Sequence, residues 1–299
     1  MRVRDKFRKN SAPTLSKLIR YFLRSPLIPI SLKNTLWSIA EKYVSFYGVE
    51  GFSSLNNGTY MKVNTSKMVE KQIYYFGEWE PFFTRYLMDT QNSDNEIFLD
   101  IGANIGYFTL ITSAIFNQVL AIEASPSIHH RLSENIKFNQ LSNVISYNVA
   151  VGENKGKANF YFDDAQSGGS SLLAGGSRRL EAEVGVAPLF DIIPEKTLDK
   201  ITFIKVDVEG FEHVVMSQIF DNLESMNEKL KIMVEYGPSR EGNLWHWIER
   251  FTNSDFSAHF LQGPYDVKEY TDRSLRSALV KVTSKPDIFC DLLLIRSIN

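Results

Sequence analysis

The chain has 299 residues, and its composition of 43% hydrophobic and 23% charged residues is typical of a globular protein with a substantial core. The net charge of −2 gives no reason to expect nucleic acid as a partner. The single cysteine, Cys290, excludes an internal disulfide and a metal site built from cysteines, and it fits a cytoplasmic protein.

The first 50 residues carry an excess of positive charge: through Lys33 they hold nine lysines or arginines against one acidic residue. Apolar residues recur at helical spacing on both sides of Pro26 and Pro29, which predicts two short helices, the second over 32–44. No apolar run reaches the roughly 18 to 20 residues that span a bilayer. We therefore expect residues 1–50 to form a basic helical extension. It is either a cap on the main domain or a basic amphipathic surface that contacts an assembly partner or anionic lipid at the inner face of the membrane.

Residues 51–95 show mixed patterns, with a strand expected at 72–76 and a helix at 81–88. From residue 96 onward, short apolar strands alternate with amphipathic helices, which is typical of a parallel sheet covered by helices. The strand at 97–101 is apolar along almost its whole length, so we expect it at the centre of the sheet. Further strands are expected at 119–122, 144–151, 203–207, 232–235, 256–261 and 291–296.

A long insertion separates the third and fourth expected strands. It contains two tracts of small residues, at 167–171 and 175–176. Loops of this length inside a compact domain often close over a substrate, so Ser170 and Ser171 are candidate substrate contacts. A plain surface loop is the alternative.

The segment 100–107 follows the first apolar strand and opens a helix. Glycines at 102 and 106 let the backbone turn sharply and approach a ligand, and the N–H groups at the start of the helix suit a polar ligand group. Asp100, at the end of the strand, can hold an ammonium or a hydroxyl group. Glu123 ends the next strand, 21 residues after Gly102, where such folds place an acid against ribose hydroxyls.

The spacing of these glycines helps to distinguish a dinucleotide cofactor from a cofactor without phosphate. Dinucleotide-binding turns follow the pattern G-x-G-x-x-G, whereas here Asn104 stands between glycines four residues apart, so a pyrophosphate fits poorly. S-adenosylmethionine has an ammonium and a ribose and lacks phosphate, which matches Asp100 and Glu123. The sequence therefore favours a methyltransferase. A nicotinamide-dependent oxidoreductase or epimerase and a non-catalytic cofactor-binding scaffold are the alternatives.

A second group of charged residues lies at the end of the fourth expected strand. Strand alternation points Lys205 and Asp207 to the same face, and Glu209 lies beyond the tip, where ligands bind in open α/β sheets. Asp207 and Glu209 are candidates for the general base, with Lys205 orienting them; a purely structural ion pair is the alternative. Together with Glu235 these carboxylates could instead hold Mg²⁺, which we do not favour, and no other metal is expected.

Five sequence blocks, in order, resemble FkbM-type methyltransferases, and the resemblance covers roughly residues 72–240. It implies a Rossmann-like class I fold, a mostly parallel seven-stranded α/β sheet with an antiparallel last strand, within a methyltransferase domain at 51–299 whose core is 96–299. It also implies O-methylation of a sugar, glycan or related natural product, and it places Ala103, Ala150 and Asp207 among the cofactor-binding residues. The basic residues 1–50 lie outside the pattern. The blocks are 77–81, 98–110, 122–126, 148–152 and 203–212.

Overall fold

The computed structural model describes residues 3–44, 48–90, 95–162, 172, 179–238, 243–261, 266–276 and 278–297. These residues form two compact units. The N-terminal unit comprises Met1–Tyr86 and Gly263–Arg276, and the sheet unit comprises Leu87–Gln262 and Ser277–Asn299. Each unit has its own buried residues.

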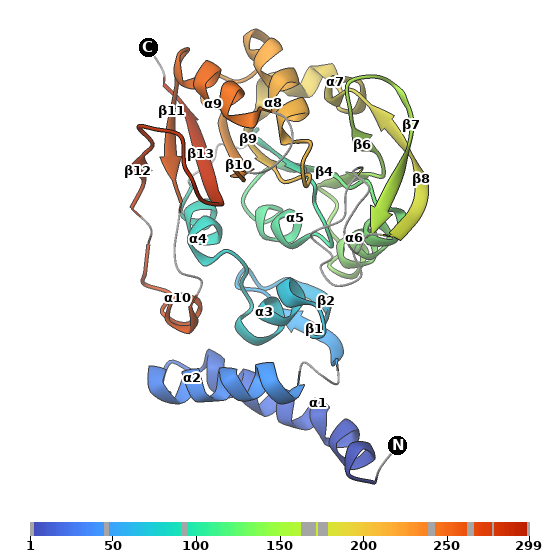
Figure 1. The fold of residues 1–299 in the computed structure, drawn as a ribbon, viewed down its shortest axis with the longest axis vertical. Coiled ribbons are helices and arrows are strands. Elements are labelled where there is room, and N and C mark those ends of the chain that lie inside the picture. The colour runs from blue at the N-terminus through green and yellow to red at the C-terminus, as the bar shows by residue number, and fades with distance from the viewer. Residues whose placement is uncertain are drawn as a thin grey trace. The chain divides into compact units, whose positions relative to one another are not determined.

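The sheet unit is built on one large sheet with the strand order β12-β11-β13-β10-β9-β3-β4-β5 (Figure 1). The strands from β10 to β5 run parallel, whereas β13 runs antiparallel to both of its neighbours. This is the mostly parallel α/β, Rossmann-like sheet that the sequence predicts, and the two-residue strand β12 extends it at one edge. The bounds are β3 Ile97–Ile101, β4 Gln118–Ile122, β5 Val144–Tyr147, β9 Ile201–Val206, β10 Lys231–Tyr236, β11 Phe256–Phe260, β12 Val280–Lys281 and β13 Cys290–Arg296.

The central strands β3 and β9 are buried along their whole length, which explains their nearly continuous apolar sequences. Their register aligns Asp100 with Lys205 and Ile101 with Val206, so both strands end at the same edge of the sheet. Helices follow β3, β4, β9 and β10 in turn, as a doubly wound fold requires. They are α5 Tyr107–Thr112, α6 Pro126–Phe138, α8 Glu212–Asp221 and α9 Leu244–Thr252; the shorter helical segments are α7 Leu189–Ile192, η4 Glu195–Lys200 and η5 Leu223–Ser225.

The strand expected at 144–151 is two strands. β5 ends at Tyr147, and β6 (Ala150–Val151) joins β7 (Gly156–Phe162) and β8 (Arg179–Ala187) in a separate sheet of order β6-β8-β7. The break falls at Asn148, whose side-chain amide donates hydrogen bonds to the carbonyl oxygens of Glu123 and Ala124 at 2.9 and 3.0 Å. The flanks of the long insertion are therefore paired strands.

The N-terminal unit contains the two expected helices, α1 (Val3–Arg24) and α2 (Ile30–Ile39), the latter continued by one π-helical turn, η1 (Ala40–Val44). A hairpin-like pair, β1 (Glu50–Ser54) and β2 (Tyr60–Asn64), follows them. The remaining helices are α3 Met68–Phe76, α4 Pro81–Asp89, which crosses into the sheet unit, and α10 Val267–Thr271. None of the helices in the described ranges has both the length and the apolar content needed to cross a bilayer.

The prediction of a strand at 72–76 is wrong, because these residues form the second half of α3. Ile73, Tyr74, Tyr75 and Phe76 are all buried, so the sequence shows a continuous apolar run in which the helical period is hidden. Gly77, with φ of 77°, ends the helix in the left-handed conformation. The helix expected at 81–88 is confirmed by α4.

Arg24, the last residue of α1, ties that helix to the rest of the N-terminal unit. Its guanidinium donates six hydrogen bonds to β1 and α3, three of them to the terminal carbonyl groups of α3. The helices before residue 50 thus pack with residues up to Tyr86 in one compact unit. A folding boundary near residue 50 stays a prediction.

Candidate active site

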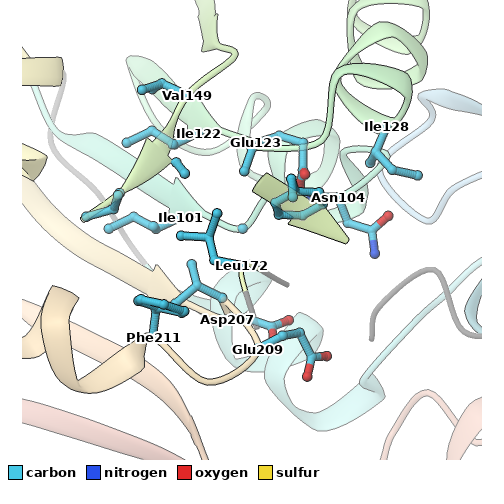
Figure 2. A pocket seen from close by; sticks show the side chains of 16 residues that line it. Ile101, Asn104, Ile122, Glu123, Ile128, Val149, Leu172, Asp207, Glu209 and Phe211 are labelled. Carbon is cyan, nitrogen blue, oxygen red and sulfur yellow. The ribbon is translucent and has the colours of Figure 1, made fainter. Parts of the chain in front are cut away.

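Sixteen residues line a cavity beside the carboxyl ends of β3, β4 and β9 (Figure 2). Figure 2 shows Glu123 and Asn104 on one side of this cavity and Asp207 and Glu209 on another. The tertiary structure thereby brings together six of the residues that the sequence singles out: Gly102, Asn104, Glu123, Ala150, Asp207 and Glu209.

The two glycines of the turn after β3 are required for different reasons. Gly102 has φ of +80°, and a Cβ there would lie 1.7 Å from the carbonyl oxygen of Asp207. Gly106 has φ of +95°, and a Cβ there would lie 2.4 Å from Cδ1 of Leu132 in α6. Gly102 therefore lets the turn pass against the end of β9, whereas Gly106 lets α6 pack on the start of α5.

Between the glycines, Asn104 adopts a left-handed conformation with φ of 51°, which asparagine tolerates better than most residues. Its Oδ1 accepts a hydrogen bond from the N–H of Ile105 at 2.8 Å. Its own N–H donates to Oε2 of Glu123 at 2.9 Å. The turn and the acid after β4 are thus one hydrogen-bonded assembly.

Glu123 is held in a fixed orientation on the cavity wall. Its Oε1 accepts the N–H of Ser125 at 2.8 Å, and Oε2 accepts the N–H of Asn104. Burial raises the pKa of Glu123 to about 7, although these two hydrogen bonds oppose the shift. Each oxygen has a further acceptor position, so the carboxylate can accept two neighbouring hydroxyl groups.

Asp100 lies outside the cavity lining, buried with 1% of its surface exposed. Its Oδ2 accepts the hydroxyl hydrogen of Thr109 at 2.6 Å, which ties β3 to α5. Burial raises the pKa of Asp100, and the nearby Lys205 ammonium opposes that shift. A contact of Asp100 with the cofactor stays a prediction, as it does for Ala103 and Gly106, which also lie outside the lining.

Lys205 and Asp207 form an ion pair, with 2.8 Å between Nζ and Oδ2. The lysine side chain is 3% exposed and that of the aspartate 32%, so the pair connects the buried strand to the cavity. This contact matches both hypotheses drawn from the sequence, an orienting lysine and a structural ion pair. Catalytic roles for Lys205, Asp207 and Glu209 stay predictions.

Three carboxylates gather near the ends of β9 and β10, and two of them, Asp207 and Glu209, line the cavity. Asp207, Glu209 and Glu235 each place an oxygen within 4.8 Å of the others. Glu209 adopts a left-handed backbone conformation with φ of 51°, an uncommon state that is concentrated at functional sites. The cluster suits a general base, and its hard oxygen atoms also suit a divalent cation.

The predicted substrate contacts Ser170 and Ser171 lie outside the described residues. The sequence reasoning missed the apolar part of the cavity lining, to which Ala124, Val149, Phe160 and Leu172 contribute. Ala124 and Val149 come within two residues of a strand end, a position that could have indicated them. Phe160 and Leu172 belong to the long insertion, and no local pattern signals that they return to the cavity.

A sequence model of the family described as the methyltransferase FkbM domain matches residues 100–259, which is more than half of the chain. Methyltransferase 1 of Beauveria bassiana is 26% identical in an alignment of 149 residues that covers 43% of this chain and 60% of that protein. Methyltransferase sdnD of Sordaria araneosa is 26% identical in an alignment of 184 residues that covers 50% of this chain and 70% of that protein.

A third relative matches a shorter segment. The tRNA(Phe) (4-demethylwyosine(37)-C(7)) aminocarboxypropyltransferase of Methanocaldococcus jannaschii is 45% identical over 56 residues, only 22% of its length. Among solved structures, a methyltransferase FkbM from Methylobacillus flagellatus has a TM-score of 0.43 at 16% identity, covering 96% of this chain and 59% of that one. On the strength of the match over residues 100–259, the chain belongs to the FkbM methyltransferase family, as its five sequence blocks predict.

Proposed function

We propose that the protein binds S-adenosylmethionine in the cavity at the ends of β3, β4 and β9 and methylates a hydroxyl oxygen of a sugar, glycan or related natural product. One observation carries the proposal. Glu123 is held as a double acceptor on one wall of a cavity whose other wall presents Asp207 and Glu209. A site that binds a nucleoside at one end and accepts a proton at the other needs acceptor groups on two facing walls.

The wall around Glu123 fits an adenosine moiety. Its carboxylate can accept both ribose hydroxyls in charge-assisted hydrogen bonds. The apolar side chains of Ala124, Ile128, Val149 and Phe160 line the same cavity and suit the flat faces of a purine ring. Gly102 lets the turn lie against the end of β9, so that the backbone of the turn lines the cavity.

The opposite wall supplies the groups for proton transfer. When bound, S-adenosylmethionine supplies an electrophilic methyl group, so the tasks of the protein are alignment and removal of a proton. Alignment of the acceptor oxygen can contribute on the order of 7 to 11 kcal/mol. We assign to Glu209, with Asp207 beside it, the role of accepting the hydroxyl proton, and to Lys205 that of orienting Asp207; the ion pair and the proximity of the carboxylates support these roles.

A divalent cation in the carboxylate cluster is not part of this proposal. Lys205 already neutralises Asp207 at 2.8 Å, which lowers the need for a further positive charge. Assays after treatment with EDTA, with and without added Mg²⁺, show whether the carboxylate cluster acts as a general base or as a metal site. Methyl transfer that persists after chelation supports a base, whereas activity that returns only with Mg²⁺ assigns the cluster to metal binding.

Calorimetric titration of the full chain with S-adenosylmethionine and with NAD⁺ tests the cofactor. We expect binding of the first alone; tight binding of NAD⁺ alone would overturn the proposal. Transfer of a labelled methyl group is then screened against sugars, glycans and small natural products. Cofactor binding without transfer to any acceptor would favour a non-catalytic scaffold.

A further inference from the structure

The N-terminal unit exposes a concentrated apolar surface. Among the described residues, 18 large hydrophobic side chains are exposed, and seven of these lie between residues 15 and 32. Among the side chains of α1 that the structure describes, from residue 13 to residue 24, Ser16, Ile19 and Leu23 are buried, whereas Leu15, Leu18, Tyr21 and Phe22 are exposed. The seven exposed residues, in α1, α2 and the turn between them, are Leu15, Leu18, Tyr21, Phe22, Leu27, Ile30 and Leu32.

The most exposed of them is Leu27, at 87%, in the short turn that joins α1 to α2. Exposed apolar residues scattered singly need no explanation, but a group of this size within one short segment marks an interaction surface. Figure 1 shows α1 and α2 lying next to each other, joined by this turn. The seven exposed residues therefore belong to two adjacent helices and the turn between them.

A groove of about 640 Å³ opens beside the same turn, between the end of α1, the start of α2 and the residues around α10. Four cationic side chains line it against a single carboxylate, that of Asp272: Arg24, Lys33, Lys268 and Arg273. Ile28 and Ile30 also line the groove, and Ile30 belongs to the exposed apolar group as well. The positive and the apolar surfaces therefore meet.

Lys33 is the unusual member of this set, because only 5% of its surface is exposed. Burial and then the nearby Arg273 lower the pKa of Lys33, while Asp272 opposes the shift. Burial, then repulsion from Arg20 and from Arg273, lowers the pKa of Arg24 to about 10. An anion in the groove would relieve this repulsion between like charges.

We propose that this basic face, residues 15–33 together with 268–273, docks on a bilayer of anionic phospholipids, with a lipid phosphate in the groove and Leu27 inserted among the headgroups. Helices that combine basic and exposed apolar side chains bind in this way, through apolar burial and attraction to anionic lipid. An acidic protein would complement the cations but would not explain seven exposed apolar side chains around them. The contact is peripheral.

Flotation of the full chain with vesicles tests this proposal. We expect binding to vesicles of phosphatidylcholine mixed with phosphatidylglycerol, little binding to phosphatidylcholine alone, and weaker binding as the salt concentration rises. The variant Leu27→Ser should weaken binding roughly tenfold through the lost apolar burial. Its matched control is Leu180→Ser, an exposed leucine in β8 of the sheet unit, which should bind as the wild type does.

The charge is tested separately with Lys268→Glu and Arg273→Glu, because both residues are exposed. Circular dichroism checks that these variants fold. Together these reversals should weaken vesicle binding by roughly tenfold or more. Lys155→Glu, an exposed lysine in a turn of the sheet unit, is the control.

Three results would overturn the proposal. They are equal binding to neutral and anionic vesicles, variants that bind as tightly as their controls, and a dimer that Leu27→Ser dissociates in the absence of any vesicle binding. Such a dimer would mean that the basic face serves self-association and not lipid binding. Cofactor titration of the same variants keeps this test independent of the proposed methyl transfer.

Discussion

The carbonyl oxygen of Asp207 occupies the space where a side chain on Gly102 would begin, 1.7 Å from the position of its Cβ. The backbone of the turn that follows β3 is therefore in direct contact with the backbone of Asp207, the residue that follows β9. Because both line the cavity, we expect a change at either one to displace both sides of the cavity wall together.

Gly102→Ala should destabilise the protein and abolish cofactor binding. The left-handed backbone costs about 1–3 kcal/mol for a residue with a side chain, and overpacking against the Asp207 backbone adds roughly 1–3 kcal/mol. Gly156→Ala is the control, since a Cβ there meets nothing within 4 Å. Urea unfolding and calorimetric titration measure both effects; wild-type affinity in Gly102→Ala would contradict the described turn.

Cofactor affinity should depend on pH through Glu123. Its pKa of about 7 means that the carboxyl is largely protonated below neutrality, whereas the ionised form is the better acceptor for hydroxyl groups. We expect binding about tenfold weaker at about pH 6 than at about pH 8. Glu123→Gln should bind weakly at both values, with a flat profile. A wild-type affinity independent of pH would contradict the assignment.

The same group makes the stability of the free protein pH-dependent. Its pKa is raised on folding from the ordinary value of 4.5, so between that value and 7 the folded state holds a proton that the unfolded chain has released. Stability therefore falls as pH rises through this window, by about 3 kcal/mol. Urea unfolding at several pH values should show a smaller slope in Glu123→Gln than in the wild type.

Glu209→Gln should lower turnover by roughly 10²- to 10⁴-fold, the range for loss of a general base, while leaving cofactor affinity nearly unchanged. Asp207→Asn should lower turnover too if the two carboxylates share the role. Glu183→Gln, an exposed glutamate of β8 paired with Lys157, is the matched control. Single-turnover assays with a known acceptor measure the rate of methyl transfer. A wild-type rate in both variants would exclude Glu209 and Asp207 as the general base.

Lys205→Met should destabilise the sheet unit by about 3–5 kcal/mol, the range for removing one partner of a buried ion pair. Asp100 would lose the ammonium that opposes the rise of its pKa, and Asp207 would lose its partner at 2.8 Å. Lys200→Met, at an exposed position, is the control. In the double variant with Asp207→Asn, the loss should be smaller than the sum of the single losses.

Arg24→Met should loosen the N-terminal unit, because six hydrogen bonds from one guanidinium are lost and three carbonyl groups at the end of α3 lose a donor. Each such bond to a charged group contributes about 1.5–3 kcal/mol, and these contributions are not additive. Hydrogen exchange of the amides in 68–76 should accelerate in this variant and stay unchanged in Lys17→Met. Equal protection in both variants would contradict an anchoring role.

Much of the sheet unit could be predicted from the sequence. Buried central strands such as 97–101 leave a continuous apolar run, and the glycine turn and the acid after the next strand lie within a few residues of those strands. The order of strands and helices then fixes where the carboxyl ends meet. For this reason Gly102, Glu123 and Asp207 could be assigned to one cavity before the structure was known.

Other features had no local signal. The helix at 68–76 is buried on every side over its second half, so its periodicity is hidden and the run resembles a strand. The division of 144–151 depends on hydrogen bonds from Asn148 to residues more than 20 positions earlier. Phe160 reaches the cavity only because β7 folds back along β8.

The sequence by itself determined the fold class, the family and the position of the glycine turn, because these follow from periodicity and from residues close together in the chain. The sequence suggested Asp207, Glu209 and Glu235 as a group, but only the tertiary structure decided that they lie within 4.8 Å of one another. It alone also decided which apolar side chains complete the cavity and that Lys33 lines a groove beside exposed leucines. The physical reason is that burial and long-range hydrogen bonds depend on the partners that folding brings together, and a local pattern carries no record of them.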